Sequence, residues 1–337
     1  MVDKKLHSPI AVLGAGSWGT ALALHLAHNK QLVNLWEFDS SQVVALQRDR
    51  CNKRYLSGFS FPETINVFGD LEKAVADVQD VLLVVPSHAF RQTLKSLQPL
   101  LNDKARILWA TKGIDPTSSQ LLNEVVTEIL GERSMAVLSG PSFAREVVSG
   151  LPTAITAASN DKMFADELVG RFNHGSFRVY TSDDLIGVQL GGAVKNVIAI
   201  AVGASDGLHY GANARSALIT RALAEIMRLG KAMGAKQNTF MGLSGLGDLV
   251  LTCTDDQSRN RRLGLAIAAG KSIKDAEAEI GQIVEGAHTA HQIINLAKQH
   301  NVDMPICQQV YRILQGKIAL KDAVKELLSR EPKVESC

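Results

Sequence analysis

The stretch that decides the fold is residues 10–19, Ile-Ala-Val-Leu-Gly-Ala-Gly-Ser-Trp-Gly. Its first four residues are apolar and predict a buried strand, while residues 20–27 after it are helix-like. A strand, a glycine turn and a helix in this order point the unpaired N–H groups of the helix at an anion in the turn. Gly14 permits the tight turn, Gly16 lets a pyrophosphate approach the backbone, and Gly19 lets helix and strand pack closely. The pattern predicts a dinucleotide site; the alternative is a glycine-rich turn without a ligand.

The composition is ordinary for a globular protein. The 337 residues are 46% hydrophobic and 21% charged, and this length suits two domains. A net charge of +2 gives no reason to expect a nucleic acid or an anionic membrane as a partner. The four cysteines have no zinc spacing, no apolar run is long enough to span a bilayer, and no signal peptide is recognisable. We therefore expect a cytoplasmic protein with free thiols, no metal and no membrane insertion.

The first half of the chain alternates strand-like and helix-like runs, as in parallel β-α-β units. Beyond the first unit, strands are predicted at residues 32–36, 80–85, 106–110 and 135–139, with two more at 153–158 and 177–181 that extend the sheet. From about Asp183, helix-length runs follow one another, at 185–202, 213–233, 259–269, 288–300 and 306–314. The predicted fold is α/β. An N-terminal Rossmann-type doubly wound sheet (residues 1–182) is followed by an all-α C-terminal domain (residues 183–337).

One lysine, Lys195, lies in an otherwise apolar helix that is rich in small residues. Burial would disfavour its charged form and lower its pKa toward the range that suits proton transfer. The alternative is a lysine at the helix edge whose ammonium reaches solvent. Asp248 is surrounded by leucine and valine and needs a cation if it is buried, so Lys195 is its candidate partner.

A second polar cluster, Ser258-Arg259-Asn260, opens the helix predicted at 259–269. Ser258 is a good N-cap, and the three residues bring a hydroxyl, a guanidinium and an amide to a helix N-terminus. This combination suits a phosphate monoester. The alternatives are a solvated basic face and a nucleic-acid patch, and the near-neutral charge and the lack of interleaved aromatic residues argue against the second. With a dinucleotide and a lysine that exchanges a proton, the cluster predicts hydride transfer to a small phosphorylated ketone.

Two further strand ends carry polar residues, in Ala110-Thr-Lys-Gly113 and in Ser139-Gly-Pro-Ser-Phe-Ala144. The carboxyl ends of parallel strands form the ligand crevice of an open α/β sheet. Lys112, Gly140 and Ser142 are therefore expected near the nicotinamide.

Seven motifs in register resemble those of bacterial NAD(P)-dependent glycerol-3-phosphate dehydrogenase. They are Gly-Ala-Gly-Ser-Trp-Gly, Val-Val-Pro-Ser-His, Ala-Thr-Lys-Gly, Ser-Gly-Pro-Ser-Phe-Ala, Gly-Gly-Ala-Val-Lys-Asn, Gly-Leu-Gly-Asp-Leu-Val-Leu-Thr-Cys and Ser-Arg-Asn-Arg-Arg. The resemblance implies reversible conversion of dihydroxyacetone phosphate to sn-glycerol 3-phosphate, a precursor of phospholipids, with Lys195 as proton donor and acceptor. It also implies a homodimer.

The same resemblance implies two sets of binding residues. Substrate contacts fall on Lys112, Gly140, Ser142, Lys195, Asp248, Ser258, Arg259 and Asn260. Cofactor contacts fall on Ser17, Trp18, Lys112, Ala144, Arg259, Ile283 and Glu285, in addition to the turn glycines Gly14, Gly16 and Gly19 and the strand-end residues Glu37 and Phe38. The residue pattern alone does not single out Ile283 and Glu285.

The sequence departs from the family pattern in Trp36-Glu37-Phe38-Asp39. The family often has a basic residue or histidine here that meets the 2′-phosphate of NADP, and this chain has Phe38 in its place. An acidic residue about 20 positions after the glycines normally binds the ribose hydroxyls of NAD. Glu37 therefore favours NAD(H), unless it points away and leaves Arg48 or Arg54 for NADP(H). The family's usual cofactor tilts the expectation slightly toward NADPH.

Two other functions fit parts of the pattern. A dehydrogenase acting on a hydroxy acid would use the Ser258-Arg259-Asn260 cluster to hold a carboxylate. A non-catalytic redox sensor would bind the dinucleotide without needing Lys195 opposite Asp248. Substrates without phosphate test the first function, and replacement of Lys195 tests the second.

Overall fold

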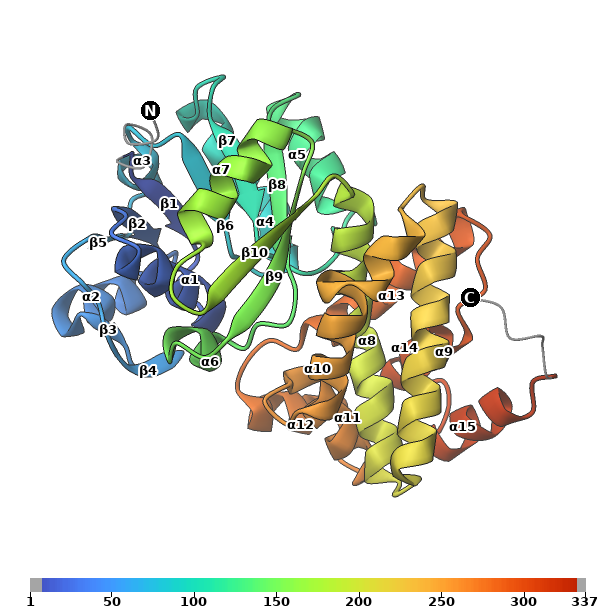
Figure 1. Ribbon diagram of the computed structural model, residues 1–337. Helices are drawn as coiled ribbons and strands as arrows, with labels where there is room; N and C mark the ends of the chain where they lie inside the picture. Colours follow the sequence, from blue (N-terminus) through green and yellow to red (C-terminus); the bar gives the residue numbers. More distant parts are fainter. Residues whose placement is uncertain (1–7, 332–337) are drawn as a thin grey trace. The chain divides into compact units, whose positions relative to one another are not determined.

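The structure, a computed structural model, describes residues 8–331, and its contacts divide the chain into two compact units (Figure 1). Unit 1 comprises Met1–Thr111 and Leu122–Leu185, and unit 2 comprises Lys112–Leu121 and Ile186–Cys337. The sequence analysis placed residues 112–121 in the first domain. The structure packs this segment with unit 2, because Ile114 and Leu121 bury their side chains in the core of that unit.

Unit 1 is built on an eight-stranded sheet with the order β10-β9-β8-β7-β6-β1-β2-β5. The strands are β1 (Ile10–Leu13), β2 (Val33–Trp36), β5 (Ile65–Phe68), β6 (Asp80–Leu83), β7 (Arg106–Trp109), β8 (Met135–Ser139), β9 (Thr153–Ser159) and β10 (Phe177–Ser182). Neighbours from β5 to β8 pair in parallel, whereas β9 pairs antiparallel with β8 and parallel with β10. The predicted parallel-dominated sheet is confirmed, and the two extending strands run in the reverse direction.

Helices cover both faces of this sheet, as a doubly wound fold requires. They are α1 (Ser17–His28), α2 (Ser40–Asp49), α3 (Leu71–Val75), α4 (Ser87–Leu97), α5 (Leu122–Leu130), α6 (Ala144–Val148) and α7 (Lys162–Phe172). Figure 1 shows α1 and α7 in front of the sheet and α4 and α5 behind it. Val12, Leu82 and Leu108 pack into one core with α1 and α7. On the other face, Trp109 meets Phe90 of α4 edge to face, with ring centroids 6.1 Å apart.

A short antiparallel pair, β3 (Cys51–Asn52) and β4 (Leu56–Ser60), stands apart from the main sheet. The sequence analysis did not identify it, because most of β4 is exposed and its residues follow no clear alternation. The pair follows α2 and brings Asn52 against the glycine turn of β1 and α1.

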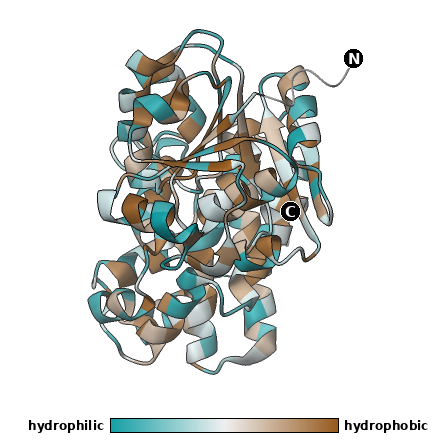
Figure 2. Cartoon of the chain, turned by 90° about the vertical axis from the view of Figure 1, so that its left-hand side faces the viewer, coloured by the Kyte–Doolittle hydropathy of each residue, from teal (hydrophilic) through white to brown (hydrophobic). Residues whose placement is uncertain are grey.

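Unit 2 has an irregular segment, Lys112–Leu121, and its described secondary-structure elements are all helices. Its helices are α8 (Leu185–Gly207), α9 (Gly211–Ala232), α10 (Asp248–Thr254), α11 (Arg259–Ala268), α12 (Ile273–Ile280), α13 (Glu285–Gln299), α14 (Pro305–Leu314) and α15 (Leu320–Leu328). A 3-10 helix over Gln237–Met241 and a π-helical turn over Leu243–Gly247 lead into α10. Figure 2 shows teal and brown residues alternating along the helices, as expected where each helix buries one face.

The helix α8 is the buried core element of unit 2. A Cβ on Gly191 would lie 2.3 Å from the carbonyl oxygen of Ser244, so this helical glycine is required for close backbone packing. Within residues 8–331, α8 alone is long and apolar enough to cross a membrane, with a mean hydropathy of 1.7. The sequence analysis found no apolar run of this length, so that statement is wrong for α8. Since 83% of the most apolar window is buried inside the protein, α8 has the character of a core helix.

Candidate active site

The glycine turn between β1 and α1 has the geometry that a dinucleotide needs. Gly14 has a φ of +109°, and a Cβ there would lie 2.8 Å from the carbonyl oxygen of Val84. A Cβ on Gly19 would lie 1.9 Å from the carbonyl oxygen of Gly14. At Gly16, by contrast, no atom lies within 4 Å of the Cβ position, so the backbone is open to a ligand. Ser17 and Trp18 open α1, where the first N–H groups lack partners within the helix, and the turn therefore fits a pyrophosphate.

Ala15 lies in the middle of this turn, and both its backbone N–H and its carbonyl oxygen are hydrogen-bonded to side chains. Its N–H donates to Glu37 Oε2 at 3.0 Å, and its carbonyl oxygen accepts from Asn52 Nδ2 at 2.7 Å. Asn52 is fully buried and also donates to Thr20 Oγ1 at 2.8 Å. Sequence reasoning missed Asn52, because a lone asparagine between Cys51 and Lys53 carries no distinctive pattern.

At the end of β8, the predicted residues Gly140, Ser142 and Ala144 form a tight turn into α6. Gly140 has a φ of +151°, and a Cβ there would lie 2.8 Å from Ile155 Cα, so only glycine fits. Ser142 Oγ donates to the carbonyl oxygen of Gly140 at 3.0 Å. Ala144 begins α6 and packs against the core that contains α1. The turn lies at the carboxyl edge of the parallel strands, the edge that also carries the glycine turn.

In unit 2, two lysines meet one buried carboxylate. Lys195 Nζ lies 2.5 Å from Asp248 Oδ1, and Lys112 Nζ lies 2.6 Å from Asp248 Oδ2. Lys195 Nζ also donates to Thr252 Oγ1 at 2.9 Å. The Lys195 side chain is 8% exposed and the Asp248 side chain 1%. The predicted contact of Lys195 with Asp248 is confirmed, and the alternative of a lysine reaching solvent is wrong.

The surroundings of Lys195 change its acidity. Burial lowers its pKa from 10.5 to about 7, Asp248 acts in the opposite direction, and the charge of Lys112 adds to the lowering. A lysine with a pKa near 7 can both give and take a proton at neutral pH. The arrangement therefore suits an acid–base role.

The second cluster forms the N-terminus of α11. Ser258 is the N-cap, as predicted, and its Oγ accepts the N–H of Arg261 at 3.2 Å. Arg259 Nη1 donates to the carbonyl oxygen of Ile283 at 2.8 Å, and burial lowers the pKa of Arg259. A partly buried guanidinium beside the first turn of a helix suits a phosphate or a carboxylate.

Asn260 connects this cluster to the lysine helix and to the start of α13. Its Nδ2 donates to Asn196 Oδ1 at 3.0 Å, and its Oδ1 accepts the N–H of Gly286 at 2.9 Å. A Cβ on Gly286 would lie 2.5 Å from the carbonyl oxygen of Asn196. The stretch with Ile283 and Glu285 is therefore tied to the residue next to Lys195. Gly286 is a sequence signal that could have found it, since the close packing requires glycine there.

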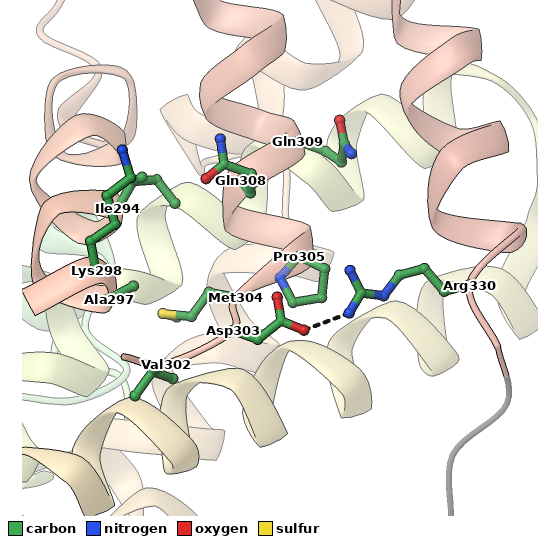
Figure 3. A pocket seen from close by; sticks show the side chains of 10 residues that line it. All are labelled: Ile294, Ala297, Lys298, Val302, Asp303, Met304, Pro305, Gln308, Gln309 and Arg330. Carbon is green, nitrogen blue, oxygen red and sulfur yellow. Dashed lines mark hydrogen bonds and ion pairs between the residues drawn. The ribbon is translucent and has the colours of Figure 1, made fainter. Parts of the chain in front are cut away.

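A surface pocket in unit 2 lies apart from these residues (Figure 3). It is lined by α13, α14, the turn between them and Arg330, which pairs with Asp303. None of the predicted site residues lines it. Among residues 8–331, no group of three or more His, Cys, Asp or Glu side chains is arranged to hold a metal ion.

Comparisons with known proteins place the chain in a family. Residues 9–165 match the family model described as NAD-dependent glycerol-3-phosphate dehydrogenase N-terminus, and residues 184–325 match the corresponding C-terminus. The chain is similar to a glycerol-3-phosphate dehydrogenase [NAD(P)+] of Shewanella sp. (strain MR-4), with 54% identity over 98% of this chain and 99% of that protein.

Solved structures agree with these matches. The crystal structure of glycerol-3-phosphate dehydrogenase from Coxiella burnetii has a TM-score of 0.94 and 51% identity, covering 96% of this chain and 100% of that one. A D-mandelate dehydrogenase structure has a TM-score of 0.60 and 14% identity, covering 92% of this chain and 98% of that one, and it shares the fold alone. Because both family models match in order and relatives above half identity span almost the whole chain, the chain belongs to the NAD-dependent glycerol-3-phosphate dehydrogenase family.

Proposed function

We propose that the chain catalyses the reversible reduction of dihydroxyacetone phosphate to sn-glycerol 3-phosphate, with NAD(P)H as hydride donor and Lys195 as proton donor. The observation that carries this proposal is the buried Lys195–Asp248 pair, in which the lysine pKa is lowered to about 7. Family membership supports the substrate and the cofactor.

Lys195 gives its proton to the ketone oxygen during reduction and takes it from the secondary hydroxyl during oxidation. An ammonium has three N–H donors, and Asp248 and Thr252 accept two of them. The third is left for the substrate oxygen. The two acceptors thus hold Nζ in one orientation, which lowers the entropy cost of reaching the reactive geometry.

The substrate phosphate would be held at the N-terminus of α11. Ser258 and Asn260 are the sequence neighbours of Arg259 there, at the N–H groups of the first helical turn. We assign Lys112, Gly140 and Ser142 to the substrate as well, on the family resemblance. The ion pair of the half-buried Lys112 with the buried Asp248 supports its assignment.

We assign the dinucleotide to Gly14, Gly16, Ser17, Trp18, Gly19 and Ala144 and, on the family resemblance, to Lys112, Arg259, Ile283 and Glu285. When bound, it supplies the hydride to the carbonyl carbon of the substrate. The open Cβ position of Gly16 and the start of α1 support the pyrophosphate position.

We further propose that the protein acts in the cytoplasm as a homodimer and supplies glycerophospholipid synthesis. The family resemblance supports all three statements. The thiols of Cys253 and Cys307 are free and buried, as expected in a reducing compartment.

The test is the loss of reduced-nicotinamide absorbance with dihydroxyacetone phosphate, compared with dihydroxyacetone and with a 2-keto acid. We expect turnover with the phosphorylated ketone and far less with the other two, because both lack the dianion that α11 would hold. Equal turnover with the 2-keto acid would favour a hydroxy-acid dehydrogenase. Dinucleotide binding without turnover of any substrate would favour a sensor.

A further inference from the structure

Glu37 stands directly after β2, and its carboxylate is held in place by three backbone N–H groups. Its Oε2 accepts the N–H of Ala15 at 3.0 Å, and its Oε1 accepts those of Phe38 at 2.9 Å and Asp39 at 3.1 Å. The sequence left open that Glu37 points away from the glycine turn. The structure excludes that orientation, because Glu37 Oε2 accepts a hydrogen bond from the Ala15 N–H of the turn.

Hydrogen bonds fix the Glu37 carboxylate against the glycine turn. Glu37 holds the N–H of Ala15 while the fully buried Asn52 holds its carbonyl oxygen at 2.7 Å. In a doubly wound sheet, the pyrophosphate lies on the turn and the adenosine ribose lies beside the end of the second strand. The Glu37 carboxylate therefore stands where the ribose hydroxyls arrive. Since each carboxylate oxygen can accept more than one hydrogen bond, it retains capacity for a ribose hydroxyl.

The nearby arginines are already engaged with acidic residues. Arg54 Nη1 donates to Asp39 Oδ2 at 3.2 Å, and Arg48 donates to both carboxylate oxygens of Asp49, at 2.7 and 3.0 Å. Phe38, where the family often has a base, is 85% exposed and carries no charge. A 2′-phosphate beside the end of β2 would thus meet the Glu37 carboxylate, while Arg54 and Arg48 are already paired with Asp39 and Asp49.

We propose that Glu37 makes this enzyme selective for NADH over NADPH. The ribose 2′-hydroxyl of NADH donates a hydrogen bond to the Glu37 carboxylate, whereas the 2′-phosphate of NADPH is repelled by it. The inference rests on the proposed dinucleotide site, and it reverses the slight tilt toward NADPH that the family resemblance suggested.

The test is the dissociation constant of each reduced dinucleotide for the whole protein, measured by isothermal titration calorimetry. For the unaltered protein we expect NADPH to bind at least about tenfold more weakly than NADH, because like charges brought together cost several kcal/mol. This ratio should shrink as salt is raised, since salt screens exposed charges.

Two variants separate charge from support of the turn. Glu37→Gln removes the charge and keeps one acceptor oxygen, enough for the Ala15 N–H or for the N–H groups of Phe38 and Asp39, whereas Glu37→Ser removes the charge and both contacts. Each should tighten NADPH binding about tenfold or more while NADH binding weakens only severalfold, since a hydrogen bond to a charged group is lost. Glu63→Gln is the matched control: Glu63 is exposed and precedes β5, which runs parallel to β2, so it lies at the opposite edge of the sheet. It should leave both constants unchanged.

Equal affinity of the unaltered protein for NADH and NADPH would overturn the proposal. An equal loss of affinity for NADH and NADPH in Glu37→Gln would also overturn it, because Glu37 would then act only as a support of the turn. If the unaltered protein bound neither dinucleotide, the proposed function itself would fail, and that outcome is distinct from a loss of selectivity.

Discussion

Lys195 owes its chemistry to where its ammonium is buried. Asp248 is shared by Lys195 and Lys112, so one negative charge faces two positive charges. The carboxylate therefore compensates each ammonium only in part, and burial dominates the pKa of Lys195, which falls to about 7.

Replacing Lys195 with alanine is expected to lower kcat for dihydroxyacetone phosphate reduction by about 100-fold or more, since general acid catalysis contributes 10²–10⁴-fold. The dissociation constant for NADH should stay nearly unchanged, because Lys195 is not among the residues assigned to the dinucleotide. Steady-state kinetics and calorimetric titration measure the two quantities. Lys231→Ala, at an exposed lysine of α9, is the control. Unchanged turnover would remove Lys195 from the mechanism.

The pH dependence of the two reaction directions should be opposite. Below a pKa of about 7, Lys195 is protonated and serves reduction, so kcat/KM for the ketone should fall as the pH rises through 7. Oxidation needs the neutral amine and should rise over the same range. Lys112→Gln removes a charge that lowers the pKa of Lys195, so both profiles should move to higher pH. If the pH profiles of Lys112→Gln matched those of the unaltered enzyme, a group other than Lys195 would set the pH dependence.

The lowered pKa of Lys195 also makes the stability of the protein depend on pH. The unfolded chain keeps the lysine proton up to about 10.5, whereas the native state loses it near 7. Between these values the unfolded state binds more protons, so the contribution of Lys195 to the free energy of unfolding rises with pH. Denaturant titrations at pH 7 and pH 9.5 should show this rise in the unaltered protein and a smaller one in Lys195→Ala.

At the scale of elements, α8, α11 and α13 are joined by the chain of contacts Asn196–Asn260–Gly286. The contact needs glycine at 286, because a Cβ would lie 2.5 Å from the carbonyl oxygen of Asn196. Gly286→Ala should therefore push α13 from α8 and cost about 1–3 kcal/mol of stability, as overpacking generally does. Since Asn260 loses the N–H of Gly286, KM for dihydroxyacetone phosphate should rise more than kcat falls.

The control for this glycine lies in α7. A Cβ on Gly170 meets no atom within 4 Å, so Gly170→Ala should be neutral or stabilise by about 0.5–1 kcal/mol. Thermal melts and steady-state kinetics measure both variants. If Gly286→Ala retained the KM of the unaltered enzyme, the link between α11 and α13 would play no part in substrate binding.

The first N–H groups of helix α14 donate to a buried carboxylate of α9. Glu225 is 1% exposed, and its two oxygens accept the N–H groups of Ile306 at 2.6 Å and Cys307 at 3.2 Å. Burial raises the pKa of Glu225 from 4.5 to about 7, although both hydrogen bonds act in the opposite direction.

The contribution of Glu225 to the free energy of unfolding should therefore fall as the pH rises. Between about 4.5 and 7 the native state binds more protons than the unfolded state, so this contribution to stability is complete below 4.5 and is lost as the pH rises through 7. Glu225→Gln cannot ionise, so its stability relative to the unaltered protein should improve from pH 5 to pH 8. Urea titrations at both values measure it, and a pH-independent difference would contradict this account.

The sequence predicted those elements whose patterns are local. Consecutive apolar residues in β6 and β7 indicate buried strands wherever they occur. The start of α13 was predicted at His288, three residues late, because Glu285 and Gly286 show no apolar periodicity. The antiparallel direction of β9 was not predictable, since a run of apolar residues is the same read either way. The pairing of Lys112 with Asp248 joins positions 136 residues apart, and only the folded chain brings them together.

For the whole molecule, the path of the chain is the feature that the sequence did not reveal. The chain passes between the two units at residues 111–112, 121–122 and 185–186. The segment 112–121 thus interrupts unit 1 and contributes Lys112 to the carboxylate centre of unit 2. A linear division at residue 182 assigns that lysine to the dinucleotide domain, although its charge partner is in the other unit.

This path predicts how an isolated dinucleotide-binding half will behave. A fragment of residues 1–185 keeps the sheet of unit 1 but lacks the helices that bury Ile114 and Leu121, each 1% exposed in the whole chain. We expect this fragment to bind NADH and to be cut rapidly by trypsin after Lys112, the one tryptic site between residues 112 and 121. In the whole protein, cleavage there should be slower, because Lys112 is paired with Asp248. Mass spectrometry of timed digests measures both rates, with cleavage after the exposed Lys30 as the internal reference. Equal rates after Lys112 would mean that unit 2 does not hold the segment in place.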